Sequence, residues 1–569
     1  MEFYDKISPT FAPPASAGAE ALRAGGKKYQ IPIPTICPDC RMIQLMAWRN
    51  ERGLHKSNCL LCDKKIVSIY AKEKNFKVLC NECFWSDKWD ALKQGREFDF
   101  SKSFFDQFSN LLKETKLLNL FSVNNENSEY VNQETNSSNC YLCIGGISNT
   151  DCCYCTYALS SKNCIDCLGI TYGENLYNCT FCTSCYSSQS LFNCHTCRNC
   201  YFCEDCIGCN DCFGSINLRH KKYHFFNKQL TKPEYQEKVE KYLNSHEGIQ
   251  KAQKEFSKHK INYIYRYANT ILCDNDCSGD NLVECKNAQN CYYSLGAEDA
   301  MNSFLLNRIK DVRDGLAVGR GELVYLSGSS PGLFATAFLT SCFNVKNSYY
   351  CYMCHNSDNL FGCVGLNHKQ YCIFNKEYTK EEYEKNVSKI IEHMIRTGEW
   401  GNFFPLSISP FGYNETMAMD YYSKNKKEIL EIDGNWFDDD ERKYDGSLYI
   451  PEDIRKYNFN SNPNAEKEIN DCLEGIIKCN TTGKFFRIVS RELAQYIEKN
   501  IQIPHDCPDT RHRNRLKLIN KMELYHRQCM CEETGHNHDG KCKNEFETTY
   551  APDRSERVYC EDCYQKSIM

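Results

Sequence analysis

The sequence has no uninterrupted apolar run of about 18 residues, the length that a membrane-spanning helix needs. No apolar run follows Met1, so we expect no signal peptide. A Walker phosphate-binding loop and the zinc-protease motif H-E-x-x-H are also missing, and the carboxylates are scattered without a convincing catalytic pair. These absences favour a cytoplasmic protein that does not enter membranes, and they leave an enzymatic function without a candidate catalytic residue.

Strong charge of one sign is lacking too, because the formal net charge is only −5 in 569 residues. Such a balance argues against a general nucleic-acid coat and does not exclude a local basic patch. Cysteine, by contrast, is abundant: the chain has 40. Without a signal peptide, the simplest interpretation is a reducing cytosol in which the thiols fill cores and zinc sites.

The cysteines between Cys140 and Cys212 follow one frame of three residues. Of the seventeen in this segment, sixteen fall on the frame and only Cys153 lies off it. Zinc fingers and disulfide scaffolds use a few cysteines at a few spacings, so neither produces this pattern. A sustained frame indicates a repetitive backbone that points the same small side chain to the same place.

A duplication supports this interpretation. Residues 213–239 recur at 361–387 without a gap, and the same 148-residue offset relates about 137–240 to about 285–390. Four framed cysteines are kept in the second copy, as Cys291, Cys342, Cys351 and Cys354. The other twelve framed positions hold small or apolar residues: Ala288, Ala300, Ser303, Val312, Gly315, Ser327, Ser330, Leu333, Val345, Ser348, Ser357 and Leu360. A buried core position tolerates such exchanges, whereas a metal cluster would lose its ligands.

The repeat unit is short. Asn or Asp precedes the framed cysteine at positions that are 12, 12, 15 and 15 residues apart: Asn139, Asp151, Asn163, Asn178 and Asn193. Repeats of this length are too short for helical pairs and suit a tight β-solenoid with Asn, Asp, Ser and Gly at its corners. We therefore predict a mainly β fold with α connectors: two tandem parallel β-solenoids, with 12–15 residues per rung, flanked by zinc-ribbon modules. A thiolate metal cluster in 194–212 and oxidised cross-links are the alternatives.

The segment 59–83 predicts a zinc site. Cys59, Cys62, Cys80 and Cys83 form two C-x2-C pairs separated by seventeen residues, which suits one tetrahedral zinc ion in a ribbon. All four ligands are thiolates, so no position is left for water, and a structural zinc is favoured over a catalytic one. A redox pair or a chance doublet is the alternative.

The C-terminus repeats this module with a ten-residue insertion. YAKEKNFKVLCNECF at 70–84 matches YAPDRSERVYCEDCY at 550–564. We expect a second zinc on Cys560 and Cys563, with Cys542 and either Cys529 or Cys531. His536 and His538 in the insertion are expected to be exposed loop residues, and substitution for a cysteine ligand is the alternative.

Further C-x2-C pairs are incomplete. Cys37 and Cys40 are intact but lack an obvious partner pair, with His55 as a weak candidate, so a third zinc site is open. The matching segment at offset 470 has Thr510 in place of Cys40. Cys479 and Cys507 alone cannot complete a four-coordinate site, so we interpret 469–515 as a degenerate ribbon without zinc.

Several segments together resemble a known family. They are CPDCR (37–41), RNER (49–52), CFWSDKWD (83–90), REFDFSKSFFDQF (96–108), NENSEY (125–130), the NC-rich repeats, FFPLSISPFGYNET (403–416) and EFETTYAPDRSERVYCEDCY (545–564). The chain resembles the cysteine-repeat, zinc-ribbon proteins of candidate-phyla bacteria and environmental genomes. Members often carry a CaiB/BaiF CoA-transferase label, which no feature of this sequence supports. The resemblance implies architecture and zinc, not a reaction, and the segment 16–26 departs from the family pattern.

These patterns predict ten segments along the chain. They are an N-terminal tail (1–30), a zinc-ribbon module (31–100), a helical connector (101–136), β-solenoid 1 (137–227), a helical linker (228–272), β-solenoid 2 (273–375), a capping helix (376–398), an irregular connector (399–468), the degenerate ribbon (469–515) and a C-terminal zinc-ribbon module (516–569).

Three functions are compatible with the sequence. The first is a non-enzymatic zinc-binding scaffold, with the ribbons as docking modules for a protein partner and the solenoids as a rigid platform. The second is a nucleic-acid- or ribosome-binding protein that contacts phosphates through a basic segment, whose cations are Arg511, Arg513, Arg515, Lys517 and Lys521. A solvated helix face is the plain alternative for that segment. The third is a metal-handling protein, or an enzyme with a site at a solenoid–ribbon junction. The sequence does not fix the oligomeric state.

Overall fold

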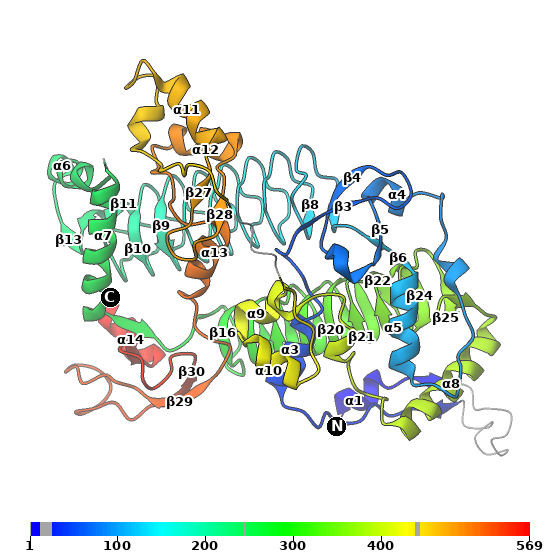
Figure 1. Cartoon of the computed structure of the whole chain (residues 1–569). Coiled ribbons are helices and arrows are strands. Elements are labelled where there is room, and N and C mark those ends of the chain that lie inside the picture. The colour runs from blue at the N-terminus through cyan, green and yellow to red at the C-terminus, as the bar shows by residue number, and fades with distance from the viewer. Residues whose placement is uncertain (1, 12–25, 244, 439–443, 569) are drawn as a thin grey trace.

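The computed structural model describes residues 2–11, 26–243, 245–438 and 444–568. It is strand-rich, and most of its strands are parallel (Figure 1). Of the segment 16–26, only Gly26 belongs to the described residues. In the part of the chain that is described, no helix is long and apolar enough to cross a membrane.

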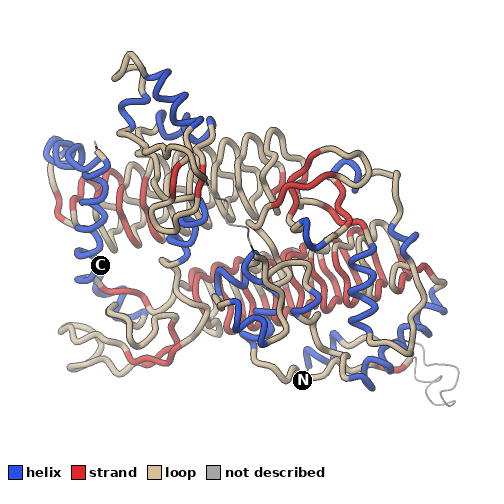
Figure 2. The backbone as a smooth tube through the Cα atoms, in the orientation of Figure 1, coloured by secondary structure: helices blue, strands red, loops and turns tan. Residues whose placement is uncertain are grey.

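Two stacks of short turns dominate the molecule. In the first stack (residues 122–229), bridges such as Tyr141 to Cys153 pair each residue with the one twelve positions later. Its named strands are β7 (Ser122–Val123), β8 (Glu134–Thr135), β9 (Gln189–Phe192), β10 (Tyr201–Glu204), β11 (Asn210–Phe213), β12 (Lys222–Phe225) and β13 (Lys228–Gln229). Figure 2 shows most of its early turns as loop, because they pair through isolated bridges.

The second stack (residues 270–377) forms a twelve-stranded sheet with the same 12-residue register, for example Val312 with Val324. Its strands are β15 (Thr270–Ile271), β16 (Gly279–Val283), β17 (Lys286–Leu295), β18 (Glu298–Phe304), β19 (Lys310–Gly319), β20 (Glu322–Pro331), β21 (Leu333–Thr340), β22 (Phe343–Lys346), β23 (Tyr349–Tyr352), β24 (His355–Phe361), β25 (Gln370–Ile373) and β26 (Lys376–Glu377). Only β26, which closes the stack, pairs antiparallel within it.

The expected range of 12–15 residues per turn is therefore corrected to a uniform 12 in both stacks. The 15-residue spacings between Asn163, Asn178 and Asn193 are one turn plus one three-residue step. Parallel pairing also begins at Ser122, earlier than the expected boundary at 137.

The backbone itself repeats every three residues. From Gln133 to Phe226, and again from Asn281 to Phe374, every third residue has a positive φ. This left-handed conformation is unfavourable for most side chains and is tolerated best by Gly, Asn and Asp, which accounts for the Asn or Asp that precedes nine of the sixteen framed cysteines. Each three-residue step has one outward residue, one left-handed residue and one inward residue. Four such steps make one turn of twelve residues.

Backbone hydrogen bonds between turns stabilise the left-handed residues. The Asn163 N–H donates to the Thr150 carbonyl at 3.0 Å, and the next outward residue, Ile165, donates to the Leu176 carbonyl at 2.9 Å. Outward and left-handed residues are thus paired with neighbouring turns. The N–H of the inward residue needs a different acceptor.

Inward side chains supply that acceptor. Ser188 Oγ accepts the Cys200 N–H at 3.1 Å and donates to the Tyr186 carbonyl at 2.8 Å. Cys342 Sγ accepts the Cys354 N–H at 3.4 Å in the same way. Cysteine and serine suit the inward position because each is small and can both accept and donate a hydrogen bond.

The expectation that the framed cysteines are buried is confirmed. All sixteen are at most 1% exposed, and they form one core with Val131, Ala158, Ile170, Leu176 and Leu191. The off-frame Cys153 points outward but is covered by residues of the middle module, defined below.

The two stacks lie side by side with opposite directions, as Figure 1 shows. Phe181 of the first stack is stacked on Tyr293 of the second, with 4.4 Å between ring centroids. They are joined by α6 (Lys232–Leu243), α7 (His246–His259) and β14 (Ile264–Arg266). Because of this arrangement, the start of each stack lies near the end of the other.

The N-terminal segment and the connectors pack on the second stack. The expected tail contains α1 (Glu2–Ile7), β1 (Thr10–Phe11) and β2 (Lys27–Lys28), and the Ile7 carbonyl accepts a hydrogen bond from Tyr349 at 3.2 Å. The helices on this side are α5 (Phe104–Glu114), α8 (Lys380–Thr397), α9 (Met417–Tyr421) and α10 (Lys426–Glu431). Helix α8 begins with a capping box, in which Thr379 and Glu382 bond to each other's backbone N–H groups.

Three modules surround the stacks. The N-terminal module has α3 (Pro38–Met46), β3 (His55–Asn58), β4 (Lys65–Ser68), β5 (Lys77–Leu79) and α4 (Asn81–Phe84), and β5 pairs with β6 (Lys116–Leu118). The middle module has α11 (Ala465–Glu474), β27 (Ile477–Lys478), β28 (Phe485–Phe486), α12 (Ser490–Glu498) and α13 (Pro508–Leu516). The C-terminal module has β29 (Tyr525–Gln528), β30 (Glu545–Thr548), β31 (Arg557–Tyr559) and α14 (Glu561–Ile568). Short 3-10 helices are η1 (Lys72–Lys74), η2 (Ala91–Gln94), η3 (Lys260–Asn262), η4 (Leu406–Ile408), η5 (Tyr413–Glu415) and η6 (Ile454–Tyr457).

The inward hydrogen bonds predict how the stack responds to substitution. Ser188→Ala would leave the Cys200 N–H buried without an acceptor, so we expect a loss of about 1–3 kcal/mol in the free energy of unfolding. Ser188→Cys keeps a small side chain with both functions and should cost much less. Urea unfolding monitored by circular dichroism compares the two, and equal stabilities of both variants would contradict the role assigned to inward side chains.

Candidate metal centres

Three groups of four side chains among the described residues can hold a metal ion. The first is Cys59, Cys62, Cys80 and Cys83, whose sulfur atoms all lie within 4.8 Å of one another. Cys62 Sγ and Cys80 Sγ are 3.8 Å apart. Metal–sulfur bonds of about 2.3 Å in a tetrahedron place two sulfurs about 3.8 Å apart, so this spacing fits one ion.

The local backbone favours the thiolate form of one of these cysteines, Cys59. Cys59 follows β3, and Cys80 directly precedes α4, whose first turn carries Cys83. Burial raises the pKa of the Cys59 thiol, but hydrogen bonds from the backbone N–H groups of Cys80 and Cys62 outweigh it and lower the pKa to about 6. The Cys80 N–H lies 3.3 Å from Cys59 Sγ. A thiol of this kind is largely deprotonated at neutral pH, the form that binds metal.

The second group is Cys529, Cys542, Cys560 and Cys563, and it has the same construction. The Cys560 N–H donates to Cys529 Sγ at 3.2 Å, as Cys80 does to Cys59. The Cys529 N–H donates to the Asn544 carbonyl at 2.8 Å, matching the bond from Cys59 to Lys64 at 2.9 Å. Of the two alternatives left open by the sequence, Cys529 therefore takes the place of Cys59.

The third group is Cys531, His536, His538 and Cys563, and it shares Cys563 with the second. Cys531 Sγ is 3.2 Å from His536 Nδ1, and Cys563 Sγ is 3.4 Å from His538 Nε2. The His536 side chain is only 8% exposed. The expectation that both histidines are exposed loop residues is thus wrong, because the inserted loop folds back over the cysteines.

Cys37 and Cys40 do not join a group of three or more ligands within the described part of the chain. Both are exposed at the start of α3, where Cys37 Sγ accepts the Cys40 N–H at 3.4 Å. His55, the weak candidate partner, instead lies 2.6 Å from Glu415 Oε1.

In the middle module a threonine hydroxyl lies between two cysteine thiols. Thr510 Oγ1 lies 3.4 Å from Cys479 Sγ and 3.3 Å from Cys507 Sγ. This buried hydrogen-bonded cluster joins the same two turns that a metal would join, and it agrees with the interpretation of the module as a degenerate ribbon.

None of the three groups includes a cysteine from the framed segment 140–212. Thiols there donate to carbonyl groups, as Cys197 does to those of His195 at 3.4 Å and Cys206 at 3.3 Å. These geometries are those of packed thiols, and the described residues hold no candidate metal cluster in 194–212.

The basic segment is only partly available to nucleic acid. Arg511 and Arg515 are buried, and both contact the buried carboxylate of Asp166 in the first stack, at 3.3 and 3.0 Å. Arg511 also contacts Glu492 at 3.2 Å. Both guanidinium groups are therefore used inside the molecule, and the prediction that they contact phosphate is wrong. The other three cations, Arg513, Lys517 and Lys521, are exposed.

One short motif was missed in the sequence. Residues 328–332, GSSPG, fit the G-x-S-x-G pattern of hydrolases. Ser330 is fully buried, however, and its hydroxyl donates to the Gly328 carbonyl at 2.6 Å and accepts the Cys342 N–H at 3.2 Å. It is an inward residue of the second stack and not an accessible nucleophile.

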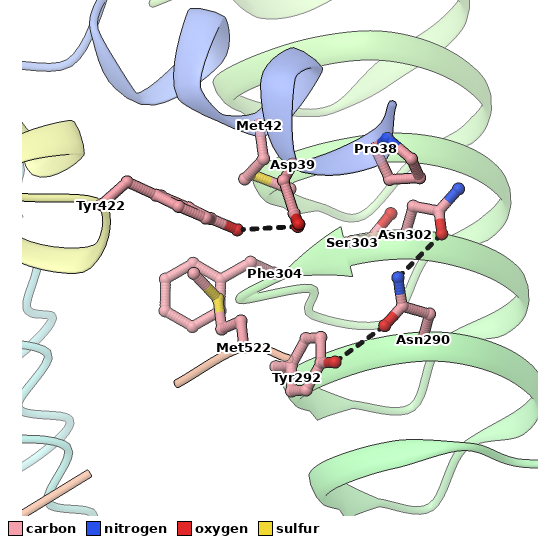
Figure 3. Close-up of a pocket in the computed structure, with 10 residues that line it drawn as sticks. All are labelled: Pro38, Asp39, Met42, Asn290, Tyr292, Asn302, Ser303, Phe304, Tyr422 and Met522. Atoms are coloured by element: carbon pink, nitrogen blue, oxygen red, sulfur yellow. Dashed lines mark hydrogen bonds between the residues drawn. The ribbon is translucent and has the colours of Figure 1, made fainter. Parts of the chain in front are cut away.

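Figure 3 shows a pocket where α3, the second stack, the connector and the C-terminal module meet. Tyr422 donates to Asp39 at 3.4 Å, and Asn290 donates to Asn302 at 2.9 Å. Its volume is about 20 Å³, enough for one water molecule and far below the size of a substrate site.

The buried ion pairs predict what holds the middle module on the first stack. Asp166→Asn keeps the shape and tolerates the left-handed backbone, but it leaves Arg515 and part of Arg511 without a counter-ion. Loss of one partner of a buried pair costs about 3–5 kcal/mol, so hydrogen exchange in α12 and α13 should accelerate at least about 100-fold. The half-exposed, left-handed Asp211 gives the control variant, Asp211→Asn. Equal exchange in both variants would show that the ion pairs do not hold the module.

No family model matches this chain, and no curated protein sequence matches it either.

Proposed function

We propose that this chain is a non-enzymatic zinc-binding scaffold, in which two β-solenoids form a rigid platform and two zinc ribbons hold them in a fixed relation. The single observation that carries the proposal is the position of the four-cysteine groups. Each belongs to a module that contacts both stacks, and the two modules lie at opposite ends of the pair.

The N-terminal module joins the start of the first stack to the end of the second. Asn132 of the first stack donates to the Asn50 carbonyl at 3.1 Å. On the other side, the Tyr70 hydroxyl is 2.8 Å from that of Tyr352 in the second stack, and both are buried. Trp48 also contacts the Tyr352 ring, with centroids 5.6 Å apart.

The C-terminal module joins the other two ends. Thr549 donates to the buried Asp280 of the second stack at 2.8 Å. Tyr564 donates to Asp205 of the first stack and accepts from Arg219 at 3.0 Å. Strand β31 extends these contacts by pairing in parallel with β14, which connects the stacks.

Zinc is the ion that best suits these groups. Four thiolates complete a tetrahedral coordination shell and leave no position for water or substrate, which supports a structural role. Metal binding and folding of such modules are one process, worth about 10–16 kcal/mol. Zinc would therefore determine whether each module persists, and through its contacts whether the stacks keep their arrangement.

The sequence suggested that the ribbon modules dock a partner. In the structure their surfaces instead contact the two stacks. The outer faces of the stacks are the surface left for a protein partner, as in other solenoids. On the first stack they expose Ile147, Tyr172 and Tyr186. Nucleic-acid binding is the second candidate, and its remaining support is the exposed set of Arg513, Lys517 and Lys521.

Removal of one zinc ligand tests the proposal. Cys80→Ser should release one zinc per chain and free the N-terminal module from both stacks. We expect a larger radius of gyration in small-angle scattering with little change in β-sheet circular dichroism. Cys363→Ser, at an inward position of the second stack, is the matched control and should retain all the zinc. A wild-type chain without bound zinc, or an unchanged radius of gyration in Cys80→Ser, would refute the proposal.

A further inference from the structure

We propose that the C-terminal module holds two metal ions joined by the thiolate of Cys563, whereas the N-terminal module holds one. The inference rests on the proposed zinc-binding role and adds a second site to it. Cys563 Sγ lies within 4.8 Å of every ligand atom in both C-terminal groups. A thiolate has more than one lone pair and can bridge two ions.

The inserted loop supplies what the second ion needs. Cys59 and Cys62 are separated by two residues, whereas their counterparts Cys529 and Cys542 are separated by twelve. The ten additional residues carry Cys531, His536 and His538. Together with Cys563 they give two sulfur and two nitrogen ligands, a set that is common for tetrahedral zinc.

The ring nitrogen that faces away from the cysteines lies near an acceptor in both histidines, which leaves the other nitrogen directed at a cysteine. His538 Nδ1 lies 2.7 Å from the Gly540 carbonyl, which requires a proton on Nδ1 and leaves Nε2 free to face Cys563. His536 Nε2 lies 3.6 Å from the Glu533 carboxylate, and Nδ1 faces Cys531. Metal-bound histidines usually donate their second ring N–H to a carbonyl or carboxylate, as His538 does to Gly540. The 3.6 Å contact of His536 with Glu533 is an ion-pair distance and is too long for a hydrogen bond. Glu533 and Gly540 belong to the same insertion as the histidines.

Spacing and charge agree with this assignment. A tetrahedral ion with about 2.3 Å bonds to sulfur and about 2.05 Å bonds to nitrogen separates the two ligand atoms by about 3.6 Å. The measured contacts of 3.2 and 3.4 Å are close to that value. One divalent ion among the four thiolates leaves a net charge of −2, whereas two ions among five thiolates leave −1. The second ion thus reduces the charge that the buried sulfurs carry.

Metal content measures the first part of the proposal. Full-length protein loaded with Zn2+ and freed of excess metal should contain three zinc ions per chain by mass spectrometry. The double variant His536→Ala/His538→Ala should contain two. Cys563→Ala should contain one, and its counterpart Cys83→Ala, which has no bridging role, should contain two. Wild-type protein with two zinc ions, or no loss in the double histidine variant, would overturn the second site.

Cadmium-113 NMR of the wild-type protein tests the bridge without any substitution. We expect three signals, of which two are coupled to each other through Cys563 and one, from the N-terminal module, is uncoupled. Three uncoupled signals would overturn the bridge. Different results would contradict the proposed function. These are the absence of the signal from the N-terminal module, or an unchanged arrangement of the stacks in Cys80→Ser.

Discussion

The stacks depend on a left-handed residue at every third position. Such residues are individually unfavourable, by about 1–2 kcal/mol for most side chains, and they persist because most of them donate their N–H to the turn before, as Asn163 does to Thr150. The three-residue step directs every third side chain inward, and the pairing between turns sets the turn at twelve residues. The inward N–H groups then require small side chains that accept hydrogen bonds, and cysteine and serine meet that requirement.

Two chemical populations of cysteine follow from this constraint. The framed thiols have carbonyl groups as partners and fill a core, whereas the module thiols meet one another at the spacing of a metal tetrahedron. The middle module shares features with both populations. Its Cys479 and Cys507 lie close together, as metal ligands would, but Thr510 joins them by hydrogen bonds. A single residue type thus fills the core of the stacks and forms the groups that can hold a metal ion in the modules that join them.

The sequence predicted what depends on local spacing. The frame of three predicted the buried thiols, and the C-x2-C pairs predicted the group of four cysteines at 59–83 that can hold a metal ion. It could not predict contacts between distant segments. In the sequence, Arg511 and Arg515 suggest a phosphate-binding surface. In the structure both contact Asp166, which lies some 345 residues earlier in the chain. The histidines were misjudged for the same reason, because the path of the inserted loop decides their exposure. The sequence did not show that every turn has twelve residues, because a period of three also allows 15 residues between successive Asn-Cys pairs.

Cysteine-resolved alkylation under native conditions tests the division into packed and metal-binding thiols most directly. Each cysteine is identified by mass spectrometry after brief treatment with iodoacetamide, with and without a chelator. The account predicts that Cys37 and Cys40 react at once, that the ligands of the two outer modules react only after chelation, and that the sixteen framed cysteines of 140–212 stay unmodified in both conditions. Alkylation of the framed cysteines on chelation would contradict it, since those thiols would then be metal ligands and not a packed core.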